Sequence, residues 1–235
     1  MTFAVRMIGW SKSGFVWRPT ISSDVTNWVL YSQALAAGWD GVVPLDAEVT
    51  VASGIVLSAN STSAYGFDTG SGFPVGTSLK LIMPGYVCGM GGAGGATNTA
   101  GSNGGPALRA QHAISIDALG GVTAGGGGGG GGSGFGGGGG GGGRSGRTDA
   151  VGGVASYPGA NGTFSSGGAG GNSGGAGGTT GPGGAGSLSA GGGGGGWGAS
   201  GGTAGSNAGG TGGAAVVGNS YITWINTGTR YGAIT

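Results

Sequence analysis

Few residues in this chain have side chains that could do acid–base or nucleophilic chemistry. There is one histidine, His112, and one cysteine, Cys88. The seven acidic residues are scattered along the sequence: Asp24, Asp40, Asp46, Glu48, Asp68, Asp117 and Asp149. A catalytic site needs several ionisable groups that converge in one pocket. The pattern therefore predicts a protein that is not an enzyme and has no catalytic residues.

The cysteine and the histidine also fail to suggest a cofactor or a metal. A nucleophilic cysteine needs a base within hydrogen-bonding reach, and the spacing from Cys88 to His112 does not indicate one. A single cysteine excludes both a disulfide framework and a zinc-ligand spacing. We expect Cys88 to be a small buried hydrophobe and His112 to lie at the edge of a strand. No cofactor and no metal site are predicted.

Nucleotide and nucleic-acid binding are excluded on similar grounds. Strings of the form Gly-x-Gly-x-x-Gly occur throughout, but they arise inside polyglycine, outside a strand–turn–helix context, and no phosphate-loop lysine follows them. Arg144 and Arg147 stand in an Arg-Ser-Gly-Arg segment, yet two arginines are too few for binding driven by counterion release. The net charge is only +1. We expect no nucleic-acid partner.

Binding to another macromolecule is the chemistry that the remaining side chains can support. Six residues from side-chain-rich parts of the glycine-rich region are the candidate contact residues: Arg144, Arg147, Asp149, Tyr157, Phe164 and Trp197. Arginine, tyrosine and tryptophan are the usual anchors of protein interfaces, and an exposed aromatic ring without a local core favours binding. The alternative for Tyr157, Phe164 and Trp197 is that they cover the ends of glycine segments. Phe135, between two glycine runs, is expected to anchor a turn.

These candidates depend on a glycine-rich region that must hold them in place. Glycine makes up 71 of the 235 residues and nearly half of residues 91–213. A local repeat of three, as in 167–172 and 174–179, matches polyproline II geometry, in which each backbone polar group must bond to water or to a neighbouring segment. The equal runs Gly125–Gly132 and Gly136–Gly143 suit stacking in one layer. Disorder is the alternative, and collagen is rejected because the register slips often and prolines are few.

The residues before this region have an ordinary composition. Ser23 or Asp24 can cap a helix that runs to Ala37, with Gly38 as its stop, and short strands are expected at 48–51, 54–59 and 78–83. Further strands are expected at 113–116 and 221–225. The tryptophans Trp10, Trp17 and Trp28 either form a core or provide a docking surface.

The predicted fold class is mostly irregular and β. It comprises a small N-terminal α+β attachment region followed by a sandwich of packed polyglycine II helices flanked by short strands. The expected division is 1–88 for attachment, 89–218 for the glycine-rich domain with exposed loops, and 219–235 for a C-terminal strand that closes it.

Several motifs carry a resemblance to a known family. The glycine-rich segments Gly89–Gly95 and Gly104–Ala107, with the long polyglycine runs, resemble the receptor-binding adhesin at the long-tail-fibre tip of T-even-type bacteriophages. The segments Ala36–Gly41 and Asn219–Ile225 look like tail-tip proteins of long-tailed phages with non-contractile tails. The resemblance covers about residues 36–228, and the N-terminal region departs from the T-even adhesin.

The resemblance implies a location and two partners. The chain would sit on the virion, at the distal end of a tail or tail fibre, attached to a tail-fibre or tail-tip protein as a single copy or a trimer. Its loops would bind a bacterial outer-membrane protein or surface glycan. Met1–Trp10 lack a secretory signal pattern, so synthesis in the host cytoplasm is expected. The alternatives are a structural tail-tip protein without receptor contact and an ice-binding protein.

Overall fold

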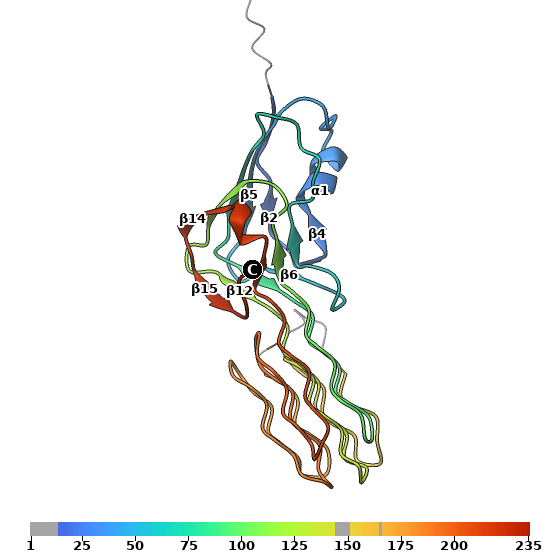
Figure 1. Ribbon diagram of the computed structural model, residues 1–235. Helices are drawn as coiled ribbons and strands as arrows, with labels where there is room; N and C mark the ends of the chain where they lie inside the picture. The colour runs from blue at the N-terminus through green and yellow to red at the C-terminus, as the bar shows by residue number, and fades with distance from the viewer. Residues whose placement is uncertain (1–13, 144–150, 165) are drawn as a thin grey trace, which may run out of the picture.

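The body of the molecule is a three-sided parallel β-solenoid. The computed structural model describes residues 14–143, 151–164 and 166–235 (Figure 1). Its strands form three sheets, here called A, B and C, and all strand pairs in them are parallel. The chain visits the sheets in the order A, B, C and then begins the next coil, so each coil adds a strand to the edge of each sheet.

Sheet A contains β1 (Phe15–Trp17), β5 (Leu45–Val51), β8 (Ser78–Ile82), β11 (Ile114–Asp117) and β14 (Ile222–Asn226), with β2 (Thr20–Ile21) also paired to β5. Sheet B contains β3 (Val25–Thr26), β6 (Val56–Ser58), β9 (Tyr86–Cys88), β12 (Val122–Ala124) and β15 (Thr229–Tyr231). Sheet C contains β4 (Trp28–Val29), β7 (Phe67–Asp68), β10 (Leu108–Arg109) and β13 (Val216–Val217).

Alternation of apolar and polar residues makes these segments strands with one face inward. In β5 the residues of Leu-Asp-Ala-Glu-Val-Thr-Val are alternately buried and half-buried, as expected for a strand whose side chains point to opposite faces. The parallel register places like residues at one level of the core, so that Val49 lies beside Leu81. In sheet C, Phe67 and Leu108 lie side by side in the same way. Burying each such side chain contributes roughly 1.5–3 kcal/mol, which makes these ladders the main stabilising feature of the solenoid.

The corner between sheets C and A holds the α-helix of the described chain, α1 (Leu30–Ala36), and a later corner holds a short 3-10 helix, η1 (Asn219–Tyr221). Leu30 and Ala34 face the core. The predicted helix start at Ser23 or Asp24 is wrong, because 25–29 pair with the next coil as β3 and β4. The helix ends close to the predicted stop, where Gly38 has a φ of 100°.

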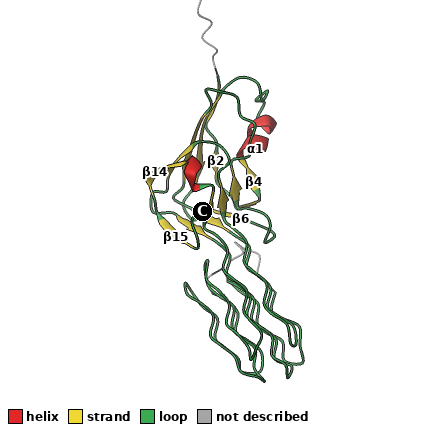
Figure 2. Ribbon diagram, in the orientation of Figure 1, coloured by secondary structure: helices red, strands yellow, loops and turns green. Residues whose placement is uncertain are grey.

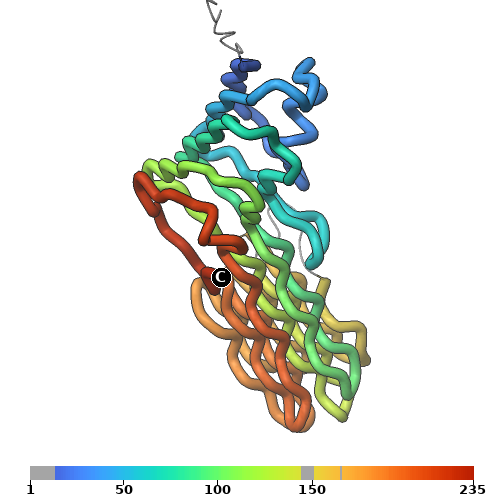
Figure 3. The backbone as a smooth tube through the Cα atoms, turned by 45° about the horizontal axis from the view of Figure 1, so that its top comes forward, coloured from blue at the N-terminus to red at the C-terminus, as the bar shows by residue number. Residues whose placement is uncertain are grey.

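The glycine-rich residues form insertions at one corner of the solenoid. Segments 59–66, 89–107 and 125–215 each connect a strand of sheet B to the strand of sheet C in the same coil. Figures 1 and 2 show the two longer ones running away from the solenoid as extended loops that turn back at the far end. We call 89–107 and 125–215 together the glycine insertion. It lies at the opposite end of the molecule from the beginning of β1, as the tube in Figure 3 also shows.

Backbone hydrogen bonds join the neighbouring segments of the insertion. The run 125–132 donates in turn to segments 99–105, 140–143 and 199–202 that surround it, in addition to one bond to Tyr231. Backbones can approach this closely only where Cβ is absent. A Cβ on Gly129 or Gly130, for example, would overlap a carbonyl oxygen of an adjacent segment. The segments therefore support one another through their main chains, with few side chains between them.

The predicted fold class is therefore wrong. The part of the chain that the structure describes is dominated by strands in three parallel sheets with one α-helix, and not by a small α+β region followed by a sandwich of polyglycine II helices. Strands β10, β11 and β12 lie between the glycine-rich segments and belong to the solenoid. The glycine insertion therefore consists of loops that connect strands of the solenoid. The individual strands expected near 48–51, 54–59, 78–83, 113–116 and 221–225 are confirmed.

Candidate functional site

The turns at the far end of the glycine insertion form a compact surface. They comprise residues 97–98, 134–136, 154–157, 172–173, 187–189 and 204–207, which we call the distal tip. Side chains connect separate turns: Asn207 Nδ2 donates to Asn98 Oδ1 at 3.2 Å, and Asn172 Nδ2 donates to the carbonyl of Ser189 at 2.7 Å. These bonds join two pairs of turns that are separated in sequence.

Local backbone chemistry explains where the chain reverses. Asn98, Asn172 and Ser173 have left-handed φ values of 58°, 56° and 56°, and Gly136 has a φ of 91°. Asparagine tolerates this conformation better than most residues because its short polar side chain can bond locally, and glycine adopts it freely. Ser133 Oγ accepts a bond from the backbone of Gly137 at 2.7 Å and closes the turn around Phe135.

Large apolar side chains project from the distal tip into solvent. Phe135 is 72% exposed, Leu188 67% and Tyr157 55%, and Val154 beside Tyr157 is also exposed. Exposed apolar groups that gather on one face mark interaction sites more often than scattered ones do. The hydrogen-bonded turns hold these side chains outward, so little conformational entropy would be lost when they bind.

The distal tip carries no charged side chain. None of its residues is Asp, Glu, Lys or Arg, and the glycine insertion has charged residues only at Arg144, Arg147 and Asp149. Recognition by the distal tip would therefore depend on shape, apolar contact and neutral hydrogen bonds.

The structure separates the residues predicted to contact a partner. Tyr157 lies at the distal tip, where its backbone bridges to Gly137. Phe164 and Trp197 lie at the opposite end of the insertion, and their ring centroids are 6.1 Å apart. Arg144, Arg147 and Asp149 fall outside the described residues.

Phe164 and Trp197 pack against sheet B. The ring of Trp197 is 5.0 Å from that of Tyr231 and 6.3 Å from that of Tyr86, and Trp197 is only 7% exposed. Phe164 meets Tyr86 edge-on at 5.6 Å. We call these four rings the aromatic clamp. Phe164 and Trp197 therefore cover the edge of sheet B where the insertion begins.

Trp17 and Trp28, two of the three tryptophans predicted to attach the chain, lie at the other end of the solenoid. Trp28 is buried and stacks between Trp17, at 6.2 Å, and Phe67, at 5.4 Å. Trp17 is half-buried, next to the exposed Val16. Trp10 falls outside the described residues.

Sequence reasoning did not identify Phe135 and Leu188 as exposed side chains of the distal tip. Phe135 was expected as a turn anchor, and it does occupy the turn between two glycine runs, but its ring points to solvent. The available signal was its position: a single large side chain between two glycine runs has no neighbouring side chain against which to pack.

The candidate catalytic groups do not converge. Within residues 14–143, 151–164 and 166–235, no group of three or more His, Cys, Asp and Glu side chains could hold a metal ion. In the same ranges no helix is long and apolar enough to cross a membrane. His112 packs against Phe73 with ring centroids 4.8 Å apart, and its burial there lowers its pKa. Cys88 is buried in sheet B, as expected.

The fold and the site together define a class of protein: a parallel β-solenoid with a long glycine-rich insertion that ends in exposed, uncharged turns. A family model described as phage tail fibre adhesin Gp38 matches residues 17–235. The chain belongs to this family of bacteriophage tail fibre adhesins, which confirms the resemblance found in the sequence.

A solved structure agrees with this assignment. The chain is similar to a component of the gp37–gp38 adhesin tip complex of the bacteriophage S16 long tail fibre, with 25% sequence identity and a TM-score of 0.67. The match covers 94% of this chain and 82% of that one. Among curated proteins, none matches the chain.

Proposed function

We propose that this adhesin recognises a bacterial surface receptor through its distal tip. The observation that carries the proposal is the gathering of Phe135, Leu188 and Tyr157 on hydrogen-bonded turns at the end of the molecule farthest from β1. An outer-membrane protein and a surface glycan are both candidate receptors. Arg144, Arg147 and Asp149, which fall outside the described residues, are a second set of candidate contacts.

Binding to susceptible cells tests this role. The double variant Phe135→Ser and Leu188→Ser removes two exposed apolar anchors, and we expect it to lose at least tenfold in cell binding, since interface anchors contribute about 2 kcal/mol or more each. The matched control is Val75→Ser, which changes a 98% exposed apolar residue on the solenoid. Circular dichroism checks the fold of each variant. Wild-type binding by the folded double variant would contradict the proposal, and absence of binding by the wild type would favour a purely structural tail role.

We also propose that the first coil attaches the chain to a phage tail fibre protein. Among residues 14–143, 151–164 and 166–235, strands β1, β3 and β4 are the edge strands of the three sheets at this end, and each pairs with a strand on one side. Edge strands with unpaired backbone groups readily pair with another chain. The related S16 protein was solved in a complex named gp37–gp38, which supports a fibre partner for this chain as well.

The attachment can be tested separately from receptor binding. Val16→Asp places a charge on exposed β1, and we expect at least a tenfold loss of co-purification with the tail fibre protein of the same phage. Ile225→Asp is the control, since it places a charge on the exposed Ile225 of β14, at the opposite edge of sheet A. Cell binding by the isolated Val16→Asp protein should be unchanged. Retained co-purification would show that the fibre protein docks elsewhere.

A further inference from the structure

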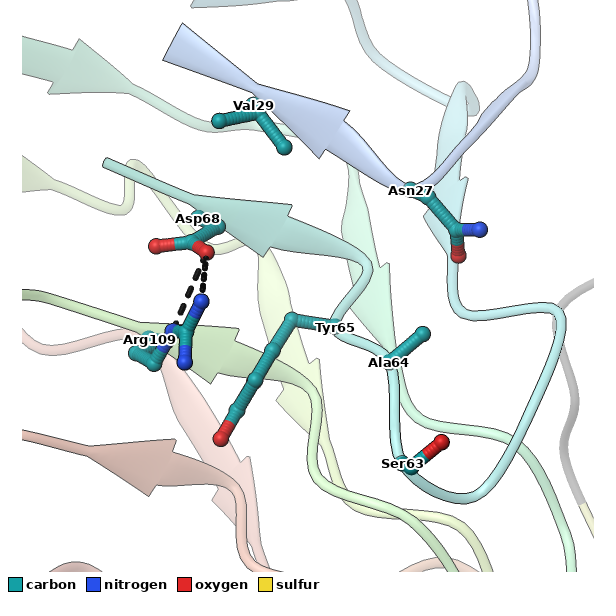
Figure 4. Close-up of a pocket in the computed structure, with 7 residues that line it drawn as sticks. All are labelled: Asn27, Val29, Ser63, Ala64, Tyr65, Asp68 and Arg109. Carbon is teal, nitrogen blue, oxygen red and sulfur yellow. Dashed lines mark hydrogen bonds and ion pairs between the residues drawn. The ribbon is translucent and has the colours of Figure 1, made fainter. Parts of the chain in front are cut away.

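A cleft on the outer side of sheet C has the features of a small-ligand site. Its volume is about 240 Å³, and its walls come from β4, the loop 59–66, β7 and β10. The side chains that line it are Asn27, Val29, Ser63, Ala64, Tyr65, Asp68 and Arg109 (Figure 4). It is smaller than the roughly 300–1,000 Å³ of sites for drug-sized ligands, so it suits a ligand of about one ring.

The central ion pair of the cleft is fixed from several sides. Arg109 Nε donates to Asp68 Oδ2 at 3.0 Å, and Arg109 Nη2 bonds to the same oxygen. Asp68 Oδ1 accepts from the backbone of Gly70 at 2.9 Å and from Gln111 Nε2 at 3.0 Å. Both carboxylate oxygens are therefore occupied, and Asp68 serves to orient Arg109 and has no free oxygen for a ligand.

One nitrogen of the guanidinium group points away from Asp68 (Figure 4). Figure 4 shows its third nitrogen, Nη1, on the side away from Asp68, toward the cleft wall formed by Tyr65. Arg109 lies over the Tyr65 ring at 4.3 Å from the centroid, and its side chain is 35% exposed. The hydrogen bond to Asp68, followed by that carboxylate's charge and Tyr65, raises the pKa of Arg109 and keeps it a donor.

These groups favour a neutral, hydroxyl-rich ligand over an anion. An anion would bind best to two adjacent N–H groups of the arginine side chain. Asp68 already accepts from Nε and Nη2 and adds a negative charge beside them. The other polar groups of the wall already have neighbours, since the Tyr65 side chain interacts with Arg109 and Ser63 Oγ lies 3.2 Å from Ser61 Oγ. A ligand would meet them as single donors and acceptors, next to the apolar Val29 and Ala64. Ring hydroxyls that both donate and accept, together with an apolar ring face, complement such a wall.

We infer that this cleft binds one neutral sugar ring. Two elements that line the cleft adjoin the glycine insertion, because the loop 59–66 lies at the same corner of the solenoid and β10 follows 89–107 directly. The cleft is therefore near the base of the insertion. If the tip touches a bacterial surface, a function proposed above, the cleft faces the zone into which surface polysaccharides extend. The sugar would then be a residue of such a polysaccharide, bound in addition to the receptor at the tip.

The test is an NMR titration of the isotope-labelled full chain with neutral sugars. The probes are methyl α-D-glucopyranoside, methyl α-D-galactopyranoside and N-acetylglucosamine, with glucuronate and inorganic phosphate as anionic comparators. We expect at least one neutral sugar to shift the signals of Tyr65 and Arg109 with a millimolar Kd, and the anions to leave them in place. Shifts with the anions alone, or with no probe, would overturn the inference.

Three variants locate the site and separate it from the tip. Ala64→Trp fills the cleft without touching the Asp68–Arg109 pair and should abolish the shifts, whereas Val75→Trp, an equal change on an exposed loop, should preserve them. Tyr65→Phe removes only the hydroxyl and should weaken binding about fivefold. The Phe135→Ser and Leu188→Ser protein should bind the sugar like the wild type, so a failed sugar titration and a failed cell-binding assay remain distinct results. Unchanged sugar binding by folded Ala64→Trp would show that the sugar does not bind in this cleft.

Discussion

At the scale of single residues, glycine acts through the absence of a side chain. A Cβ on Gly130 would overlap the carbonyl oxygen of Gly192 in a neighbouring segment, and one on Gly192 would overlap that of Gly202. These contacts are with backbone atoms that also hold hydrogen bonds, so neither side can move without disturbing further segments. Gly134, in contrast, has open space around it, with Asn98 Oδ1 at 3.8 Å as the nearest atom to an added Cβ.

This contrast gives a stability prediction. Gly130→Ala should lower the free energy of unfolding by about 3 kcal/mol or more, because the added methyl group forces backbone segments apart. Gly134→Ala should change it by less than about 0.5 kcal/mol, since the position is open and away from core features. Urea unfolding followed by circular dichroism measures both. Equal stability of the two variants would show that the segments are not packed as the structure has them.

The sequence could identify candidate contact residues but not their exposure. Tyr157, Phe164 and Trp197 look alike as isolated aromatic residues among glycines. Only Tyr157 reaches the distal tip, whereas Phe164 and Trp197 face sheet B. A residue is exposed at the tip or packed on sheet B according to whether its turn lies at the far or the near end of the insertion. The end is set by how many times the chain has reversed direction before that turn. The composition of the sequence does not reveal the number of reversals.

At the scale of elements, the aromatic clamp connects two unlike parts. The glycine insertion has few apolar side chains of its own, so its attachment to the solenoid depends on Phe164 and Trp197 meeting Tyr86 and Tyr231. Aromatic pairs in such edge-on and tilted arrangements contribute about 0.5–1.5 kcal/mol beyond the area they bury. The clamp thus fixes the direction in which the insertion leaves sheet B.

Removing the central ring of the clamp should loosen this junction. Trp197→Ala deletes a side chain that is 7% exposed, and we expect a loss of about 3–5 kcal/mol in the free energy of unfolding. Phe135→Ala, at a 72% exposed ring, is the control and should cost less than about 0.5 kcal/mol. Chemical denaturation provides the comparison. A loss below about 1 kcal/mol in the Trp197 variant would mean that the clamp does not hold the insertion.

Strands could be predicted from the sequence, but their assembly could not. The alternating pattern of β5 is visible in its seven residues, and so are the apolar stretches of β8 and β11. Strands such as β4, β7 and β10 have only two residues each, and they pair across 39 or more positions with partners set by the coil. Local periodicity is too short there to indicate a strand, and parallel pairing between distant segments leaves no local signal. The helix start was missed for the same reason.

At the scale of the whole molecule, the two proposed contacts lie at opposite ends. The first coil faces away from the glycine insertion, and the distal tip is the most remote point from it (Figures 1 and 3). The solenoid and the insertion are both joined by backbone hydrogen bonds between neighbouring segments. Such an arrangement can hold the tip away from the fibre at a fixed orientation, while the side chains on its turns are free to differ without affecting the core.

The distribution of charge over the molecule makes the salt dependence of receptor binding a decisive measurement. The ion pairs of the described residues, Arg18–Asp46, Glu48–Lys80 and Asp68–Arg109, all lie on the solenoid, whereas the distal tip has none. Interactions between exposed charges are screened over about 8–10 Å at 0.1–0.15 M salt, but apolar contacts are not. If the tip alone makes the contact, the affinity for susceptible cells should change less than about twofold between 50 mM and 500 mM NaCl.

The same titration separates the distal tip from the second set of candidate contacts. A steep loss of affinity with salt would indicate that charged residues take part, and the triple variant Arg144→Ala, Arg147→Ala and Asp149→Ala should then abolish that dependence. A flat salt profile together with wild-type binding by this triple variant would assign recognition to the neutral tip. A steep profile that persists in the triple variant would contradict both sets and direct the search to the charged faces of the solenoid.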